Sequence, residues 1–257
     1  FLIKEIEKKN ILINEKKKIE NKTTTGSKNP IYILGISAFY HDSAATLIKD
    51  GRIIASAQEE RFSRVKNDRR FPASAINFCL ERASIQQTDL KAIVYYDNTS
   101  LTLERTLWSF LNTSPNSIKG WLKSMPAWVK YKFFIPQLIR SKLNYNGKIF
   151  QNLHHRSHAA SAFFPSPFKR SAILTIDGVG EWATASIGQG DENKIKVLKE
   201  MNYPNSLGLL YSAFTKFIGF KVNSGEYKMM GLAPYGNPIF YEVILKELID
   251  LKEDGSI

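Results

Sequence analysis

The sequence predicts an α/β protein made of two similar units. Short β-prone runs joined by tight turns open the ordered part of the chain, helical stretches rich in aromatic residues follow, and a second series of strands then begins near residue 148. The 257 residues are enough to bury a substantial core, and 43% hydrophobic and 23% charged residues are typical of a soluble globular protein.

The first unit is predicted to begin with three antiparallel strands. Asp50-Gly51 separates two β-prone runs, and this dipeptide is a strong hairpin signal. A helix is expected to start after Pro72, because proline is favoured in the first helical turn. The predicted order is strands at 31–37, 44–49 and 52–57, a helix at 73–83, a strand at 92–96, and helices up to about residue 142.

The second unit repeats this plan only loosely. Residues 173–187 resemble residues 33–48 in their order of strand, polar loop and strand, although two unrelated hairpins would give the same pattern. If the units face each other, His41 and Asp177 lie on opposed loops of a cleft suited to nucleotide phosphates and their metal. The predicted elements are a strand at 148–150, a helix at 155–164, strands at 172–176 and 183–187, and a third strand after them.

All four histidines fall in two short segments. His41 stands alone, whereas His154, His155 and His158 are clustered. On a helix, residues four apart lie on one face, so His154 and His158 could bind one metal ion. The alternative is an accidental pair, because an isolated His-x-x-x-His motif is weak evidence for a site.

Asp177 is a plausible third ligand. It ends an apolar run and precedes Gly178 and Gly180, a pattern that indicates a buried strand delivering a carboxylate into a backbone turn. Two imidazoles and a carboxylate suit iron, zinc or manganese alike, so the ligand types leave the metal open.

The net charge of +12 comes partly from the first 30 residues, where eight lysines face four glutamates. This segment is predicted to be a disordered, solvated lead-in. Residues 101–145 interleave aromatic residues with lysines, a pattern given by amphipathic helices or by a nucleic-acid-binding surface. Amphipathic helices are the commoner cause, and nucleic acid is therefore not the expected partner.

The single cysteine excludes a disulfide framework and a cysteine zinc site. Cys79 lies in an apolar helical stretch and is expected to fill the core. The sequence contains neither a long apolar segment typical of a membrane span nor the pattern of a secretory signal. A cytoplasmic protein is expected.

Five motifs, in order, resemble those of the NodU/CmcH-type O-carbamoyltransferases. The resemblance covers residues 31 to about 237 and implies a duplicated βββαβα fold of the actin-like ATPase and sugar-kinase-like class, with an incomplete second half. The motifs are GISAFYHDSAA (35–45), EERFSR (59–64), HHRSHAASAF (154–163), DGVGE (177–181) and GEYKMMGLAPYG (225–236).

The resemblance implies a function. Such enzymes join carbamoyl phosphate and ATP through a carbamoyl-adenylate and pass the carbamoyl group to a hydroxyl of a small molecule, typically a sugar, nodulation factor or antibiotic. By motif match, His154, His158 and Asp177 would hold a divalent metal that also meets the nucleotide phosphates, with Fe²⁺ favoured by the resemblance alone. His155 has no such role.

His41 with its neighbour Asp42 is the candidate catalytic group, which would bind the carbamoyl group or take the proton of the acceptor hydroxyl. A purely structural histidine is the alternative. Glu226 could equally be a helix cap, and Lys228 could pair with a phosphate or a carboxylate. The expected nucleotide- and phosphate-binding residues are Gly178, Gly180, Gly208, Gly225, Glu226 and Lys228.

The chain is expected to be a truncated member of this family. Residues 31–257 would form the N-terminal part of the actin-like domain, without the YrdC-like domain that handles carbamoyl phosphate, so the chain alone is expected to be inactive. A sugar kinase or ATPase of the same fold remains an alternative, because fold does not fix function. A basic nucleic-acid-binding module is a third, with steeply salt-dependent binding.

Overall fold

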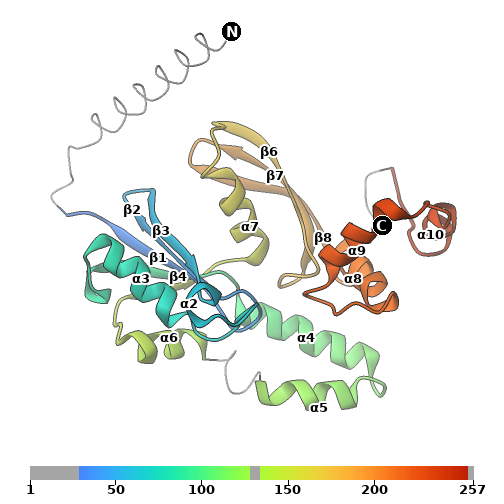
Figure 1. The fold of residues 1–257 in the computed structure, drawn as a ribbon, viewed down its shortest axis with the longest axis horizontal. Coiled ribbons are helices and arrows are strands. Elements are labelled where there is room, and N and C mark those ends of the chain that lie inside the picture. Colours follow the sequence, from blue (N-terminus) through green and yellow to red (C-terminus); the bar gives the residue numbers. More distant parts are fainter. Residues whose placement is uncertain (1–28, 128–133, 254–257) are drawn as a thin grey trace, which may run out of the picture.

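The computed structural model describes residues 29–127 and 134–253, which form two β-sheets with helices around them (Figure 1). The first sheet has five strands in the order β3-β2-β1-β4-β5, and the second has three in the order β6-β7-β8. The predicted α/β class is confirmed. The lysine-rich lead-in lies, up to residue 28, outside the described residues.

The first sheet mixes two kinds of strand pairing. β1 pairs antiparallel with β2, and β2 with β3, whereas β1, β4 and β5 run parallel. The β2–β3 turn has positive φ at both Asp50 (47°) and Gly51 (80°), as a two-residue hairpin turn of type I′ requires. The strands are β1 (Tyr32–Ser37), β2 (Ala44–Lys49), β3 (Arg52–Gln58), β4 (Leu90–Tyr95) and β5 (Lys148–Gln151).

Helices cover this sheet and close its core. Leu34, Leu47, Ile76, Ile93 and Ile139 have no exposed surface, which joins β1, β2 and β4 to α3 and α6 in one apolar cluster. Cys79 of α3 lies in the same cluster, as expected for a core filler. The helical elements are α2 (Glu60–Ser63), α3 (Ala73–Ala83), the 3-10 turn η1 (Gln87–Asp89) and α6 (Ile135–Leu143).

The strand predicted to start the second unit, at 148–150, instead pairs with β4 in the first sheet, so the second unit of the same plan begins with the second sheet. Helix α7 packs on one of its faces, where Ala159 and Phe163 bury Ile173. Both units open with three antiparallel strands and then a helix; a fourth strand follows in the first unit, but none follows in the second among residues up to 253. The elements are α7 (His154–Phe163), β6 (Arg170–Ile176), β7 (Ala183–Asp191), β8 (Lys194–Asn202), α8 (Leu207–Phe217), α9 (Glu226–Leu232), the 3-10 turn η3 (Ala233–Tyr235) and α10 (Tyr241–Glu247).

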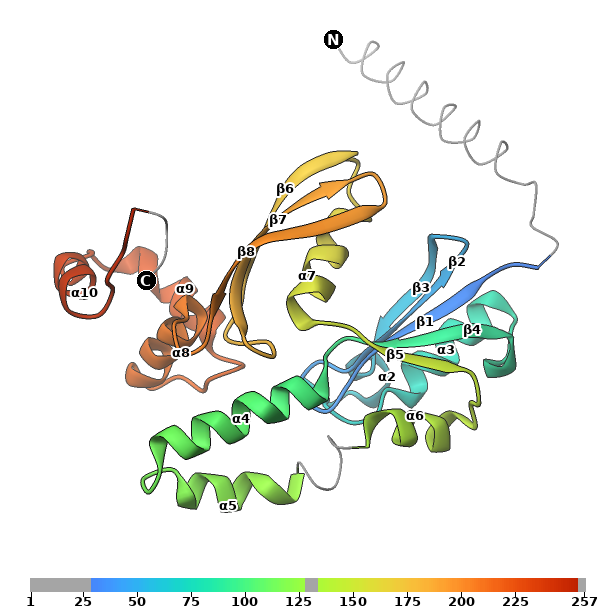
Figure 2. The same ribbon diagram turned by 180° about the vertical axis from the view of Figure 1, so that it is seen from behind.

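Helices α4 (Thr99–Thr113) and α5 (Ile118–Ala127) leave the first unit and run beneath the second (Figure 2). The Trp108 ring lies 5.6 Å from the Trp182 ring, and the Ser109 hydroxyl lies 3.0 Å from that of Tyr203. α4 therefore connects the two units. Phe110 stacks on Trp121, so this tryptophan of the aromatic–lysine stretch serves helix packing; residues 128–133 of that stretch lie outside the described part of the chain.

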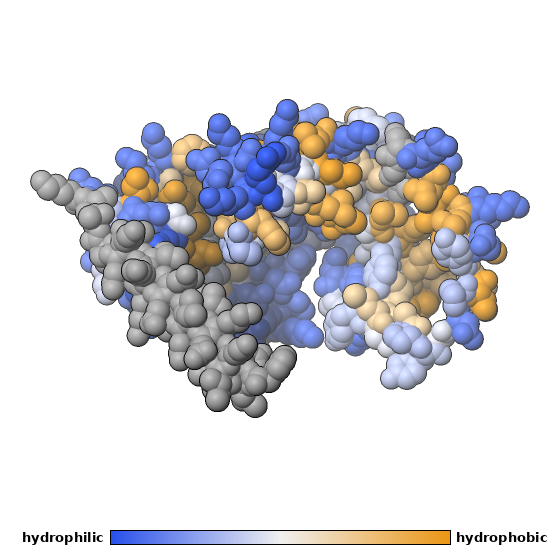
Figure 3. Space-filling model, turned by 90° about the horizontal axis from the view of Figure 1, so that it is seen from above, coloured by the Kyte–Doolittle hydropathy of each residue, from blue (hydrophilic) through white to orange (hydrophobic). Residues whose placement is uncertain are grey.

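Apolar surface concentrates on the second unit (Figure 3). Leu174, Ile176 and Ile187 are each at least half exposed, and they alternate with residues that face α7.

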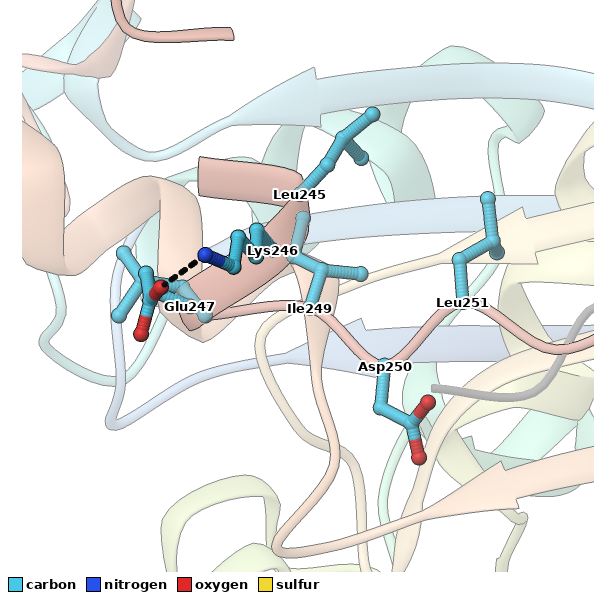
Figure 4. A pocket seen from close by; sticks show the side chains of 7 residues that line it. Leu245, Lys246, Glu247, Ile249, Asp250 and Leu251 are labelled. Atoms are coloured by element: carbon cyan, nitrogen blue, oxygen red, sulfur yellow. Dashed lines mark ion pairs between the residues drawn. The ribbon is translucent and has the colours of Figure 1, made fainter. Parts of the chain in front are cut away.

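A cavity of about 660 Å³ is lined by residues 245–251 alone and contains no predicted site residue (Figure 4). Among the helices of the described residues, none has the length and apolar character needed to cross a membrane.

Candidate functional site

The structure brings His154, His158 and Asp177 together at the junction of the two units. One turn of α7 separates the two histidines, and their Nε2 atoms lie 3.0 Å apart. Strand β6 ends at Ile176 and delivers Asp177, whose Oδ2 lies 2.6 Å from His154 Nε2 and 3.3 Å from His158 Nε2.

The donor set fits a transition-metal ion. One ligand atom from each of the three residues lies within 4.8 Å of the other two. Two imidazole nitrogens and a carboxylate oxygen are the ligand types of iron, zinc and manganese sites. The His154 side chain is 15% exposed and that of His158 is 51% exposed, so the cluster is held firmly on one side and is accessible on the other.

Without an ion, the three side chains form a charged hydrogen-bonded cluster. Hydrogen bonds from His154 and His158 hold the pKa of Asp177 well below its usual range. Burial alone would lower the pKa of His154, but the hydrogen bond to Asp177 and its charge outweigh burial and raise it. The Asp177 carboxylate is thus ionised near neutral pH, which is the form in which a carboxylate binds a metal ion.

The turn after β6 is rigid and closely packed. Asp177 donates its backbone N–H to Thr184 O (2.9 Å). Gly178 donates to Asp177 Oδ1 (2.6 Å). A Cβ on Gly208 would overlap the Asp177 carbonyl, so the first turn of α8 lies directly on this peptide. Gly178 and Gly208 therefore both lie at Asp177.

His155 faces away from the cluster and into the second sheet. It is 2% exposed, and its Nδ1 lies 2.7 Å from the Thr175 hydroxyl, which in turn contacts the Ser186 hydroxyl at 2.6 Å. Burial and the neighbouring His154 lower the pKa of His155. A neutral, buried ring with these partners stabilises the packing of α7 on β6 and β7.

Glu181 is a buried residue of the site for which we made no prediction. Its carboxylate is 5% exposed and accepts hydrogen bonds from the backbone N–H of His154 (3.0 Å to each oxygen) and of Asn98 (2.7 Å). Asp97 lies against it, and burial together with Glu181 raises the pKa of Asp97 to about 6. The sequence signal was only a glutamate at the end of DGVGE, and the helix termini that it contacts are remote in sequence.

His41 and Asp42 lie on the loop that follows β1. His41 Nδ1 is 2.9 Å from Asp42 Oδ2, and the Asn67 side-chain amide donates to Asp42 Oδ1 at 2.9 Å. Asp42 has φ of 49°, a left-handed conformation that aspartate tolerates better than most residues. The imidazole is thus oriented by a carboxylate that is itself fixed, an arrangement typical of a general base.

Tyr40 connects this loop to the second unit. Burial raises its pKa first and the charge of Asp177 second, and its hydroxyl is hydrogen-bonded to the Asn223 side chain. Glu226 also adds to the rise. Tyr40 therefore links the His41 loop to Asn223, which precedes α9, and it lies near enough to Asp177 for that charge to affect its ionisation.

Glu226 and Lys228, two of the expected phosphate-binding residues, differ in their surroundings. Glu226, the first residue of α9, accepts hydrogen bonds from Asn223 N (2.9 Å), Gly225 N (3.2 Å) and the Ser212 hydroxyl (3.2 Å), so it joins the turn before α9 to α8. Burial would raise the pKa of Glu226, but these donors outweigh it and lower it. Lys228 is exposed on the same helix.

Arg105 is a second residue that the motifs did not indicate. Its guanidinium lies 5.6 Å over the Tyr203 ring, and its buried Nε has no hydrogen-bond partner among the described residues. Burial lowers its pKa, while Tyr203, Asp97, Tyr40 and Glu181 oppose that effect.

Comparison with known proteins assigns the family. Residues 32–257 match the domain described as carbamoyltransferase N-terminus. The chain belongs to this carbamoyltransferase family. The family resemblance read from the five motifs is therefore confirmed, over nearly the same residues.

Curated relatives of this carbamoyltransferase chain are much longer. An uncharacterized protein of Synechocystis is 49% identical over 233 residues, which cover 88% of this chain and 38% of the relative. Nodulation protein NolNO of Sinorhizobium fredii is 36% identical over 224 residues, which cover 86% of this chain and 31% of that protein. The chain thus spans about a third of the length of these relatives.

Solved structures resemble the chain weakly. YeaZ from Pseudomonas aeruginosa aligns over 68% of both chains with 14% identity and a TM-score of 0.35. Component A of (R)-2-hydroxyglutaryl-CoA dehydratase of Acidaminococcus fermentans covers 80% of this chain and 70% of its own, with 16% identity and a TM-score of 0.35. The duplicated plan of the fold is instead read from the sheet topology itself.

Proposed function

We propose that this chain carries the metal site and part of the nucleotide site of an ATP-dependent O-carbamoyltransferase. The whole protein would transfer a carbamoyl group from carbamoyl phosphate, through a carbamoyl-adenylate, to a hydroxyl of a small molecule such as a sugar. The convergence of His154, His158 and Asp177 carries the proposal, because a kinase of the same fold has no need of this ligand set.

His154, His158 and Asp177 would hold the metal ion, with Fe²⁺ favoured by the family resemblance. The bound ion would supply positive charge next to the nucleotide phosphates. His154 is the most buried of the three and is fixed from both ends, by Asp177 at the ring and by Glu181 at the backbone. The exposed His158 side gives ligands access to the cluster.

His41 would take the proton of the acceptor hydroxyl as the carbamoyl group is transferred. Its Nδ1 is engaged by Asp42, which leaves Nε2 as the ring atom that can accept a proton. The carboxylate of Asp42 would then stabilise the imidazolium, as in other histidine–carboxylate pairs. Asn67 supports the pair by donating to the second oxygen of Asp42.

The glycine-containing turns would border the phosphates, although the N–H groups of Gly178 and Gly180 are already bound to Asp177 Oδ1 (2.6 Å) and Ala183 O (2.8 Å). Gly178 and Gly180 follow Asp177 in the chain, and Gly208 lies in the first turn of α8, which packs on Asp177. Close approach of backbone to a phosphate is the usual reason for glycine at such positions. Gly225, Glu226 and Lys228 would border the same space, with Lys228 as the exposed cation and Glu226 holding the turn before α9 in place.

Metal content tests the proposal directly. The purified chain is loaded with Fe²⁺ without oxygen, or with Mn²⁺, and dialysed; bound metal is then measured by elemental analysis. We expect about one ion per chain, and loss of that ion in the His154→Ala, His158→Ala double variant with an unchanged circular dichroism spectrum. Equal metal content in the double variant and the wild type would overturn the assignment.

His41→Asn is the matched control, because it removes a histidine that is not one of the three candidate metal ligands. It should keep the metal. In the whole protein the same substitution should slow carbamoyl transfer about a hundredfold, the scale of losing a positioned proton-transfer group. Unchanged turnover would reduce His41 to a structural role. Nucleotide affinity that survives loss of both metal histidines would instead favour a plain kinase or ATPase.

A further inference from the structure

Glu181 lies where the two units meet, and its contacts reach both of the helices that start there. It is contributed by the turn between β6 and β7, whereas the N–H groups that it binds belong to His154, the first residue of α7, and to Asn98, which precedes α4. A carboxylate at a helix N-terminus is stabilised by the unpaired N–H groups and by the helix dipole. One buried side chain thus joins two helix starts to the second sheet.

Helix α7 depends on this contact for its N-terminal cap. Its N-cap residue is Leu153, which has no side-chain acceptor, and no acidic residue lies in the first turn. Both oxygens of Glu181 lie 3.0 Å from His154 N and take the place of the missing cap. The position of the first turn of α7 relative to the second sheet is therefore set by a residue outside the helix.

The turn that carries Glu181 also carries the metal ligand Asp177. It is closed by the hydrogen bonds Asp177 N to Thr184 O (2.9 Å) and Gly180 N to Ala183 O (2.8 Å). A Cβ added to Gly180 would lie 2.9 Å from His154 Cβ, so the turn rests directly on the first turn of α7. The same short loop holds the carboxylate ligand at one end and the anchor of the histidine ligand at the other.

We propose that Glu181 is the positioning residue of the metal site: by binding the backbone N–H of His154 and Asn98, it fixes α7 at the height at which His154 and His158 meet Asp177. This inference rests on the proposed metal site. Residues that orient metal ligands in this way change metal affinity by about ten- to a hundredfold when they are replaced.

The test is metal affinity, measured by competition with a fluorescent chelator for Mn²⁺ and by the visible spectrum of the Co²⁺-loaded chain. Glu181→Gln keeps the length of the side chain but replaces one acceptor oxygen with a donor. Glu181→Asp keeps the charge but shortens the reach. Glu200→Gln, at an exposed position of β8, is the matched control.

We expect Glu181→Gln and Glu181→Asp to bind Mn²⁺ about ten- to a hundredfold more weakly than the wild type, with an altered Co²⁺ spectrum, while Glu200→Gln binds normally. Affinities are compared at a temperature at which circular dichroism finds every variant folded. If the wild type binds no metal, the proposed metal site fails. If the wild type binds and both Glu181 variants bind equally well with the same spectrum, the positioning role is overturned.

If either Glu181 variant fails to fold, Asn98→Pro provides the second route. It removes the N–H that Glu181 Oε1 accepts at 2.7 Å, and with it the Asn98 side chain that caps α4 at Leu101 N, so Asn98→Ala, which loses the cap alone, is its control. Weaker binding of Mn²⁺ by Asn98→Pro supports the positioning role of Glu181. Wild-type affinity in it overturns the part that joins α4 to the site.

Discussion

Replacing Glu59 tests how the His41 loop is supported. Its carboxylate is 6% exposed and accepts hydrogen bonds from Ser74 N (3.2 Å) and Ala75 N (2.8 Å), at the start of α3. The N-cap residue Pro72 has no side-chain acceptor, so Glu59 is the cap. Its own backbone N–H donates to Ser43 O (2.8 Å), directly after the His41 and Asp42 pair.

The cost of Glu59→Ala can be worked out from these contacts. Loss of a helix cap costs about 1 kcal/mol, and a buried N–H left without a partner adds about 1–3 kcal/mol. Ala75 is fully buried and its N–H cannot be hydrated, whereas Ser74 is half-buried and can be. We therefore expect a loss of about 2–3 kcal/mol in the free energy of unfolding, or roughly 5–10 °C in Tm.

Urea denaturation followed by circular dichroism measures this change. Glu81→Gln is the control, because Glu81 is exposed on the same helix, and it should change the free energy of unfolding by less than about 0.5 kcal/mol. A Glu59→Ala variant as stable as this control would refute the capping role.

Two further predictions concern the loop after α2 and the turn at the metal site. Arg70 holds the pKa of the buried Asp68 well below its usual range, so the pair should stabilise the fold above about pH 4, the unfolded-state pKa, and lose this effect as the pH falls below it; Arg70→Gln should thus lower the urea midpoint at pH 7 more than at pH 3, and an equal loss at both would contradict the pairing. Gly180→Ala should lower the free energy of unfolding by about 1–3 kcal/mol and weaken metal binding, because its Cβ would lie 2.9 Å from His154 Cβ. Gly231→Ala, which has open space around it, is the control and should change neither quantity. Wild-type metal affinity in Gly180→Ala would show that the turn can move to accommodate the methyl group.

The secondary structure was predictable because each element carries its own local signal. The Asp50-Gly51 turn, the helix after Pro72 and the apolar run before Asp177 all depend on residues that are neighbours in the chain, and the structure places strands and helices there within a few residues. His154 and His158 were likewise paired by helical spacing alone. Their approach to Asp177, by contrast, was an inference from the motifs.

The residues that hold the site in place were not predictable, because their partners are distant in sequence. Glu181 contacts Asn98, 83 residues away, and Glu59 contacts the start of α3, 15 and 16 residues away. In both cases a glutamate caps a helix whose own N-cap position or first turn lacks an acidic side chain. A sequence motif identifies such a glutamate but gives no indication of which helix it serves.

The two units contribute unequally to the candidate site, and this inequality explains its architecture. The first unit supplies the His41–Asp42 pair, and α7, which follows its last strand, supplies His154 and His158. The second sheet supplies the carboxylates of Asp177 and Glu181. The two contacts of Asp177 with His154 and His158 therefore also tie the second sheet to α7. Because the candidate ligands come from both sides of the junction, a bound cation would replace these hydrogen bonds with bonds across the same junction, and metal binding and the relative position of the two units would be coupled by linkage.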